Sequence, residues 1–342
     1  GLPARRFKNI PGKMIPVHPE RIFNIKSSGE FDAMAMDVFH YQAVNNSIYK
    51  LFINNLGKNR QDISSLEEIP FLPVEFFRSH VVITGREKAE TFFESTGTTG
   101  MVRSRHYVTD PGLYDRSLLK CFRMVYGSPE DYLIVALLPS YLERPASSLV
   151  YMIRRLIDSG ADKRSGFFMS ASREMLDLIT GARDEGKKVI LAGVSFALLD
   201  LAVKYPADLS GVVIIETGGM KGRRKEITRT ELHEILKSSF NVPAVHSEYG
   251  MTELLSQAWS DGNGIFRCPP WMKVMVREIN DPLAVTGRPW KTGGINIVDL
   301  ANINSCSIIA TGDIGKLHEG GRFEVLGRFD HSETRGCNLM VE

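Results

Sequence analysis

The sequence predicts an α/β fold with a mainly parallel sheet, followed by a smaller antiparallel β lobe. Continuous apolar runs at 132–139, 188–193 and 211–216 alternate with amphipathic segments of helical period. This alternation is typical of a parallel sheet that helices cover on both faces. After residue 264 the chain changes to short β-rich pieces separated by turn residues, which indicates antiparallel hairpins.

Residues 1–90 are the predicted helical N-terminal segment. Apolar residues recur at helical spacing from Phe31 to Leu56, which favours a helix there. Ser64 precedes Ser-Leu-Glu-Glu and is a candidate helix cap. Residues 81–83 read Val-Val-Ile, a short strand candidate.

Residues 91–262 are the predicted α/β core. The predicted strands are 91–94, 132–139, 188–193, 211–216 and 242–246, and the predicted helices are 111–126, 147–158, 170–185, 194–200 and 228–240. Ligands of such sheets bind at the carboxyl ends of the strands.

The last two predicted units are a small β lobe over 263–327 and a short C-terminal tail over 328–342. The strands expected in the lobe are 273–277, 294–298, 306–310 and 321–326. Turn residues such as Asp281-Pro282 and Thr286-Gly287 separate them.

Composition excludes several classes of protein. Lys and Arg number 42 against 40 Asp and Glu, a net charge of +2, so a polybasic nucleic-acid binder is not expected. No apolar run reaches the roughly 20 residues that span a bilayer, so stable membrane insertion is not expected. The 4 cysteines are scattered, which favours a reducing, cytoplasmic location.

A Ser/Thr/Gly-rich segment at Ser95–Gly100 is the first candidate site. Glycines let the backbone approach an anion closely, and successive N–H groups form a concave nest for phosphate. Arg103 and Arg105 follow and are able to offset phosphate charge. The competing interpretation is a plain polar turn.

Two further segments carry oxygen-rich side chains. In Ser247-Glu248-Tyr249-Gly250-Met251-Thr252-Glu253, Tyr249 is suited to stacking on a base, Thr252 to bonding a phosphate, and Glu253 to holding Mg²⁺. The competing interpretation is a helix N-terminus. In Thr311-Gly312-Asp313 a loop carboxylate is suited to gripping a ribose diol, whereas a β-turn Asp is the alternative.

Taken in order, these segments resemble one superfamily. The chain resembles the adenylate-forming enzymes because four motifs occur in that group's order: STGTTG with a following basic residue, YGMTE, TGD and GRFD. These enzymes include acyl-CoA synthetases, peptide-synthetase adenylation domains and luciferases. Within that group the chain resembles LuxE-type acyl-protein synthetases, the acid-activating component of fatty-acid reductases. The sequence segments that support this resemblance are residues 138–144, 147–152, 193–199, 217–222 and 335–339.

The resemblance implies that a fatty or other carboxylic acid reacts with ATP to give an acyl-adenylate, and that the acyl group moves to a protein cysteine for a partner reductase. It implies Mg²⁺ at Glu253, the α-phosphate at Thr252 and adenine stacked on Tyr249. The other implied ATP-binding residues are Ser95, Thr96, Gly97, Thr98, Thr99, Gly100, Gly218, Gly219, Met220, Gly250, Asp313 and Arg328.

The sequence departs from the superfamily at its C-terminus. Typical members add a mobile C-terminal domain that supplies a catalytic lysine, whereas this sequence stops at Glu342, so we expect a truncated C-terminal domain. Lys221, Arg103 and Arg105 are the candidates to replace that lysine. Cys337 is the candidate acyl acceptor, because LuxE-type proteins carry this cysteine near the C-terminus and a thiolate is the nucleophile in thioester formation.

Three alternatives stay open. The first is a ligase of the same superfamily that uses CoA or a carrier protein as acceptor. The second is a hydrolase or acyltransferase, because strand–Gly193-Val-Ser195-Phe-Ala197–helix imitates a nucleophile elbow with Ser195 as nucleophile. The third is a nucleotide-binding subunit without catalysis.

Overall fold

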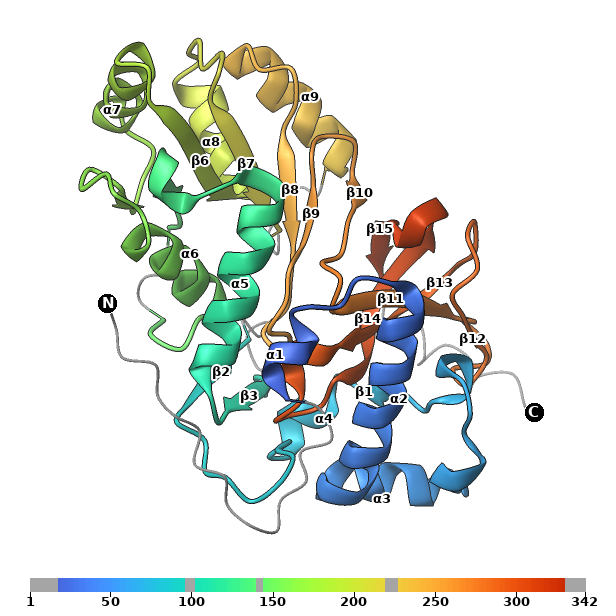
Figure 1. Cartoon of the computed structure of the whole chain (residues 1–342). Coiled ribbons are helices and arrows are strands. Elements are labelled where there is room, and N and C mark those ends of the chain that lie inside the picture. Colours follow the sequence, from blue (N-terminus) through green and yellow to red (C-terminus); the bar gives the residue numbers. More distant parts are fainter. Residues whose placement is uncertain (1–17, 96–101, 140–143, 219–226, 330–342) are drawn as a thin grey trace.

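The computed structural model describes residues 18–95, 102–139, 144–218 and 227–329. They form two lobes, each built on its own sheet (Figure 1). The helices are α1 (Pro19–Ile22), α2 (Ser28–Asn45), α3 (Ser47–Asn55), α4 (Phe76–Ser79), α5 (Pro111–Tyr126), α6 (Ser148–Asp158), α7 (Arg173–Asp184), α8 (Ser195–Lys204) and α9 (Arg229–Phe240).

The strands divide among a six-stranded sheet, a seven-stranded sheet and a hairpin. Their bounds are β1 (Leu72–Pro73), β2 (Thr91–Glu94), β3 (Arg105–Val108), β4 (Tyr132–Leu137), β5 (Gly166–Phe168), β6 (Lys188–Val194), β7 (Val213–Thr217), β8 (His246–Tyr249), β9 (Ala258–Ser260), β10 (Ile265–Phe266), β11 (Met272–Arg277), β12 (Val285–Thr286), β13 (Thr292–Asp299), β14 (Ile308–Leu317) and β15 (Phe323–Arg328).

The first lobe is the predicted parallel α/β unit. Its sheet has the order β5-β4-β6-β7-β8-β9, and all neighbours run parallel except β8 and β9. Every residue of β4 is buried, as expected for a strand covered on both faces. Helices α5 and α6 lie over one face and α8 and α9 over the other (Figure 1).

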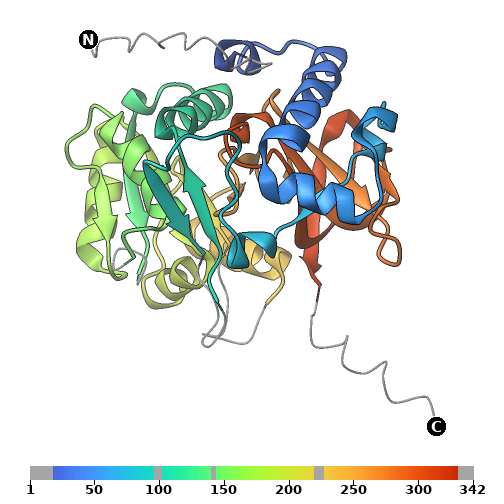
Figure 2. The same ribbon diagram turned by 90° about the horizontal axis from the view of Figure 1, so that it is seen from below.

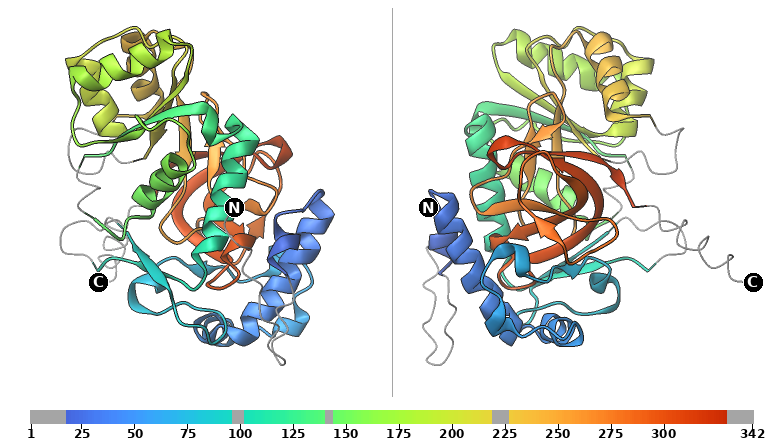
Figure 3. Two further views of the ribbon diagram at one scale, coloured as in Figure 1. Left: turned by 60° about the vertical axis from the view of Figure 1, so that its left-hand side comes forward. Right: turned by 90° about the vertical axis from the view of Figure 1, so that its right-hand side faces the viewer.

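The second lobe is a curved, mostly antiparallel sheet of order β10-β15-β14-β13-β11-β12, with β1 parallel to β14. Figure 3 shows this curvature. The N-terminal helices pack against the lobe: buried Gln42 on α2 donates to the Ile303 carbonyl and accepts from the Ser307 N–H, both at 2.9 Å. The N-terminal segment and the β lobe therefore share contacts over a long sequence separation.

A two-stranded hairpin, β2–β3, lies between the two lobes (Figure 2). Its strands pair from Thr91 with Val108 to Glu94 with Arg105. The Ser/Thr/Gly-rich segment connects these two strands. The hairpin therefore brings Ser95 and Ser104, which lie on either side of residues 96–101, within hydrogen-bond distance of each other.

Several local predictions were wrong. Residues 81–83 form no strand, and the predicted helix over 31–56 is broken at Asn46, whose side chain caps α3. The cap after residue 63 is Ser65 instead of Ser64, and it begins only a 3₁₀ turn over Leu66–Glu68. A polar side chain that bonds backbone N–H groups favours such a break over a continuous helix.

Two competing interpretations of the motifs were also wrong. Asp313 lies within strand β14 and pairs with Arg328 of β15, so the alternative of a β-turn residue is wrong, and so is our own expectation that Asp313 lies in a loop. No helix begins at Glu253, which lies in a turn. None of the helices in the described part of the chain combines the length and apolar character needed to cross a bilayer.

Candidate active site

Tyr249, Asp313 and Arg328 meet where the two lobes adjoin. The Tyr249 hydroxyl donates to Asp313 Oδ2 at 2.8 Å, and Arg328 Nε donates to Asp313 Oδ1 at 2.7 Å. Asp313 and Tyr249 are buried, whereas the Arg328 side chain is 58% exposed. The carboxylate is thus held by one buried and one accessible donor, which leaves Arg328 reachable from solvent.

The Thr311-Gly312-Asp313 segment is fixed by its neighbours in the β lobe. Thr311 Oγ1 donates to the Ile295 carbonyl at 3.0 Å and accepts from the Asp313 N–H at 3.1 Å. Arg277 donates to the Thr311 carbonyl at 2.6 Å. These bonds set the direction of the Asp313 side chain through its own backbone.

Glu253 contacts Ser104, which lies directly before the second strand of the β2–β3 hairpin. Buried Ser104 donates a hydrogen bond to Glu253 Oε1, and the Ser104 N–H donates to Ser95 Oγ at 3.0 Å. Burial raises the pKa of Glu253, while the bond from Ser104 opposes the rise. Ser104, which follows the first motif and bonds Ser95, is therefore in contact with Glu253 of the second motif.

His106 and Asn302 hold the backbone of Thr252 and Glu253 through hydrogen bonds to their carbonyl groups. His106 Nδ1 lies 2.9 Å from the Thr252 carbonyl, and Nε2 lies 2.9 Å from Asn302 Oδ1. Asn302 Nδ2 donates to the carbonyls of Glu253 at 2.8 Å and Cys306 at 2.9 Å. His106 and Asn302 are fully buried, so this clamp is rigid compared with a surface contact.

Gly250 is a position where a side chain would not fit. A Cβ there would lie 2.4 Å from Glu248 Oε1, so the glycine lets the carboxyl of Glu248 pack against the loop. Gly218, at the end of β7, is exposed and has no such neighbour. Gly250 thus has a steric reason to be glycine that the sequence did not reveal.

The predicted basic residues of the first segment have a protein partner. Arg105 Nε lies 2.7 Å from Glu94 Oε1, and Arg103 NH1 lies 3.4 Å from Glu94 Oε2. Both arginine side chains are at least half exposed. Their role toward phosphate stays a prediction.

Several predicted site residues lie outside the described part of the chain. They are Thr96, Gly97, Thr98, Thr99, Gly100, Gly219, Met220, Lys221 and Cys337. Their roles likewise stay predictions.

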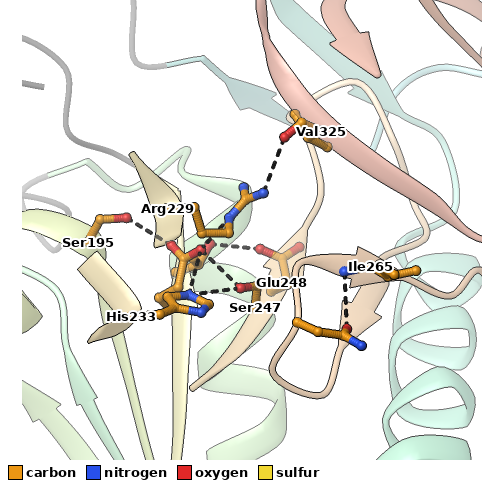
Figure 4. Close-up of polar contacts among 10 residues, drawn as sticks. Ser195, Arg229, His233, Ser247, Glu248, Ile265 and Val325 are labelled. Carbon is orange, nitrogen blue, oxygen red and sulfur yellow. Dashed lines mark hydrogen bonds and ion pairs between the residues drawn. The ribbon is translucent and has the colours of Figure 1, made fainter. Parts of the chain in front are cut away.

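A buried polar network surrounds Glu216 of β7, and its members Ser195 of α8 and Arg229 and His233 of α9 are labelled in Figure 4. Its carboxylate accepts from Ser195 Oγ at 2.8 Å, Ser247 Oγ at 3.0 Å and Arg229 Nε at 3.0 Å, and His233 lies 3.7 Å away. Burial alone would raise the pKa of Glu216, but His233 and Arg229 lower it to about 2.

This network bears on the nucleophile-elbow alternative. Ser195 does begin a helix after strand β6, yet its hydroxyl donates to a carboxylate and is buried. An activated serine instead needs a hydrogen bond to a general base such as histidine. The geometry around Ser195 therefore favours a structural role.

Sequence reasoning missed the residues that support the site from a distance. His106 contacts residues 146 and 196 positions away in the chain, and no local pattern signals such a pairing. Ser104 had a weak signal, because it stands between the two basic residues after the glycine segment. Glu248 was visible as the first of the two carboxylates of its motif.

Glu253 is the carboxylate of this site that would hold a Mg²⁺ ion shared with substrate phosphates. Among the described residues, no group of three or more His, Cys, Asp or Glu side chains is placed to hold a metal alone. Mg²⁺ is usually bound by one or two carboxylates together with substrate phosphates and water. Glu253, with one oxygen held by Ser104, is suited to be that carboxylate.

Comparison with known proteins was made by sequence and by structure. No protein-family model and no curated protein matches the sequence. Among solved structures, an ATP-bound chimera of RpMatB and BxBclM matches with a TM-score of 0.52 and 18% identity, and covers 71% of this chain and 49% of that one. ATP-bound MatB from Rhodopseudomonas palustris matches with a TM-score of 0.50 and 16% identity over the same shares.

The chain thus spans about half the length of the solved structures that it matches. At this level of identity the likeness concerns the fold alone. It confirms the predicted α/β fold class, because 71% of the chain matches the architecture of about half of the ATP-bound chimera.

Proposed function

We propose that this chain activates a carboxylic acid with ATP, forming an acyl-adenylate and releasing pyrophosphate. The observation that carries the proposal is the meeting of four separated segments, through Ser95–Ser104–Glu253 on one side and Tyr249–Asp313–Arg328 on the other. Each segment is weak evidence alone. Their contact at the junction of the lobes is what a shared nucleotide site requires.

In this proposal the chemistry is an attack of a carboxylate oxygen on the α-phosphorus of ATP. The new O–P bond forms as the bond to pyrophosphate breaks. Asp313 accepts from the ribose diol, Tyr249 supports adenine, and Thr252 bonds the α-phosphate. Because an anion attacks an anion, positioning and charge neutralisation are the main tasks. Arg328 is an accessible cation beside the site, and Mg²⁺ at Glu253 would offset phosphate charge when bound.

Exchange of labelled pyrophosphate into ATP tests this proposal. With a panel of carboxylic acids, we expect exchange that depends on both acid and Mg²⁺. Asp313→Asn should reduce it at least tenfold, while Asp281→Asn, at an exposed turn, should not change it. Absence of exchange with every acid, in a chain that still binds ATP, would favour the nucleotide-binding subunit instead.

For the second half of the reaction, we propose transfer of the acyl group to Cys337 and delivery to a partner reductase, as in LuxE-type proteins, with a fatty acid as substrate. Support comes from the other cysteines. Burial raises the pKa of the Cys121 and Cys306 thiols to about 12 and raises that of Cys268 as well, so these three are poor nucleophiles. A cytoplasmic location is part of the same proposal.

Intact-protein mass after incubation with Mg-ATP and acid tests the acceptor. We expect a hydroxylamine-labile adduct that Cys337→Ser abolishes and that Cys268→Ser leaves in place. Pyrophosphate release without an adduct would instead indicate a ligase that uses CoA or a carrier protein.

A further inference from the structure

The pairing between β13 and β14 is interrupted at residues 311–313, which we call the β14 bulge. Regular pairing stops at one residue pair and resumes at another, namely Asn296 with Ala310 and Gly294 with Ile314. Ile295 alone therefore lies opposite the β14 bulge. A bulge interrupts the ladder of hydrogen bonds and re-aims the side chains that it carries. Because Asp313 belongs to the β14 bulge, the direction of its carboxylate depends on how the bulge is held.

The guanidinium of Arg277, the last residue of β11, bonds across this interruption. One terminal nitrogen donates to the Ile295 carbonyl at 2.9 Å and to Asn296 Oδ1 at 2.8 Å. The other terminal nitrogen donates to the Thr311 carbonyl at 2.6 Å. Buried backbone carbonyls need donors, so Arg277 supplies hydrogen bonds where the ladder of β13 and β14 is interrupted.

Strand β13 has room for this side chain because residue 294 is glycine. Arg277 is paired with Gly294 across β11 and β13, and a Cβ on Gly294 would lie 2.6 Å from Cζ of the guanidinium. The φ of Gly294 lies outside the left-handed region, so the need for glycine is steric and does not come from the backbone conformation. The sheet is therefore built to admit Arg277 at this point.

The same guanidinium also contacts the chain that follows β15. It lies 5.2 Å from the centre of the Phe329 ring, within the range of a cation–π contact. The Phe329 N–H donates to the Gly312 carbonyl at 2.9 Å, and the preceding Arg328 bonds Asp313. Arg277 thus holds the β14 bulge from one side and contacts the Arg328-Phe329 segment on the other.

Arg277 is charged in this half-buried position. Burial lowers its pKa, but the nearby carboxylates of Glu75 and Asp313 favour the charged form, and a guanidinium is not deprotonated in proteins. A charged donor makes stronger hydrogen bonds than a neutral one. The planar fork of arginine also reaches several acceptors in a fixed geometry. Arg277 is therefore suited to hold the β14 bulge in one conformation.

We propose that Arg277 is the positioning residue for ribose recognition, because it holds the β14 bulge so that the Asp313 carboxylate faces the ribose hydroxyls of a bound nucleotide. Arg277 contacts no substrate in this proposal and acts through the backbone of Thr311. The inference rests on the proposed nucleotide site. It adds the residue on which the preference of that site for a ribonucleotide depends.

Calorimetric binding of Mg-ATP and of the magnesium complex of 2′,3′-dideoxy-ATP to the full chain tests this inference. The analogue lacks both ribose hydroxyls, so the wild type should bind ATP at least about tenfold more tightly, as for a lost hydrogen bond to a charged group. In Arg277→Met this ratio should fall to about threefold or less, since the carboxylate is no longer held in place. Gly294→Ala should lower the ratio in the same way, because it displaces the guanidinium without removing it.

Matched controls and a milder variant complete the set. Arg288→Met and Gly287→Ala should keep the wild-type ratio, because Arg288 is exposed and a Cβ at Gly287 would meet only Met275, at 3.8 Å. Phe329→Leu removes the ring over the guanidinium and should lower the ratio partly. Thermal unfolding shows which variants fold, and Gly294→Ala and Phe329→Leu carry the test if Arg277→Met does not fold.

The ratio separates positioning from a purely structural role, which would weaken the binding of both nucleotides alike. A wild-type ratio in the folded Arg277→Met or Gly294→Ala variant would overturn the inference. Equal affinity of the wild type for the two nucleotides, or no binding of ATP, would overturn it as well. Pyrophosphate exchange keeps the proposed function distinct. A lowered ratio without exchange for any acid would support the positioning role and contradict acid activation, whereas exchange with an unchanged ratio would do the reverse.

Discussion

The phenol of Tyr249 donates a hydrogen bond of 2.8 Å to the carboxylate of Asp313, although the two residues lie 64 positions apart. This bond links β8 of the parallel sheet to β14 of the β lobe. The ring of Tyr249 also packs edge-on against Phe323 of β15 at 5.3 Å. The contact therefore fixes how the two lobes present the candidate site.

Removing the Tyr249 hydroxyl should separate the effect of its hydrogen bond to Asp313 from the effect of its ring packing. In Tyr249→Phe the ring and its packing remain, but buried Asp313 loses one of its donors. We expect a KM for ATP raised by at least about tenfold, as for a lost hydrogen bond to a charged group, with a smaller change in kcat. Tyr107→Phe, on the β2–β3 hairpin, serves as a control. Equal losses in kcat and kcat/KM would show that Tyr249 acts only in the transition state.

Ser104 should tune the metal requirement through Glu253. Ser104→Ala removes the hydroxyl that donates to Glu253 Oε1, so the carboxylate loses its fixed orientation. Residues that orient a metal ligand typically change metal affinity tenfold or more. We expect the Mg²⁺ concentration for half-maximal pyrophosphate exchange to rise by about tenfold, with near-normal activity at saturating Mg²⁺. An unchanged Mg²⁺ requirement would show that Ser104 does not position this carboxylate.

His106 should make folding sensitive to acid. Burial lowers its pKa from 6.5 to about 4, so the ring is neutral in the folded chain at pH 7. As pH falls from 6.5 towards 4, the unfolded chain binds the proton and the folded chain does not, and stability is lost. The difference in unfolding free energy between wild type and His106→Gln should therefore fall by about 3 kcal/mol between pH 7 and pH 4. A difference independent of pH would contradict the buried, neutral assignment.

Arg229 should stabilise the charged network around Glu216. Arg229→Met leaves the Glu216 carboxylate buried with one strong donor fewer, and breaking a buried pair in this way costs about 3–5 kcal/mol. Adding Glu216→Gln should recover much of the loss, since no unpaired charge then remains. Denaturant unfolding of the two single variants and the double variant measures the coupling. Purely additive effects would show that the two side chains do not depend on each other.

The sequence predicted the α/β core well because its signals are local. The apolar runs that became β4 and β6 and the amphipathic pattern of α5 and α9 need no knowledge of distant contacts. Strand β5, with three half-buried residues, gave too little pattern to detect. The break at Asn46 depends on a side chain that caps α3 and also donates to the Ser305 carbonyl 259 positions away.

The sequence was enough to predict which motifs make up the candidate site, but not how their side chains are arranged in space. Residue types in the YGMTE and TGD segments indicated nucleotide chemistry, but only the fold shows that Asp313 is a strand residue bonded to Arg328. The place of Arg277 opposite Gly294 depends on strand register. Register is set by long-range pairing, which the local sequence does not specify.

The most direct test of acid activation follows an oxygen atom. The chain is incubated with Mg-ATP, an acceptor thiol and an acid whose carboxylate carries oxygen-18, and the nucleotide product is examined by mass spectrometry. If a carboxylate oxygen attacks the α-phosphorus, cleavage of the acyl-adenylate leaves one labelled oxygen in AMP. Labelled inorganic phosphate together with ADP would instead show attack at the γ-phosphorus and would contradict adenylate formation.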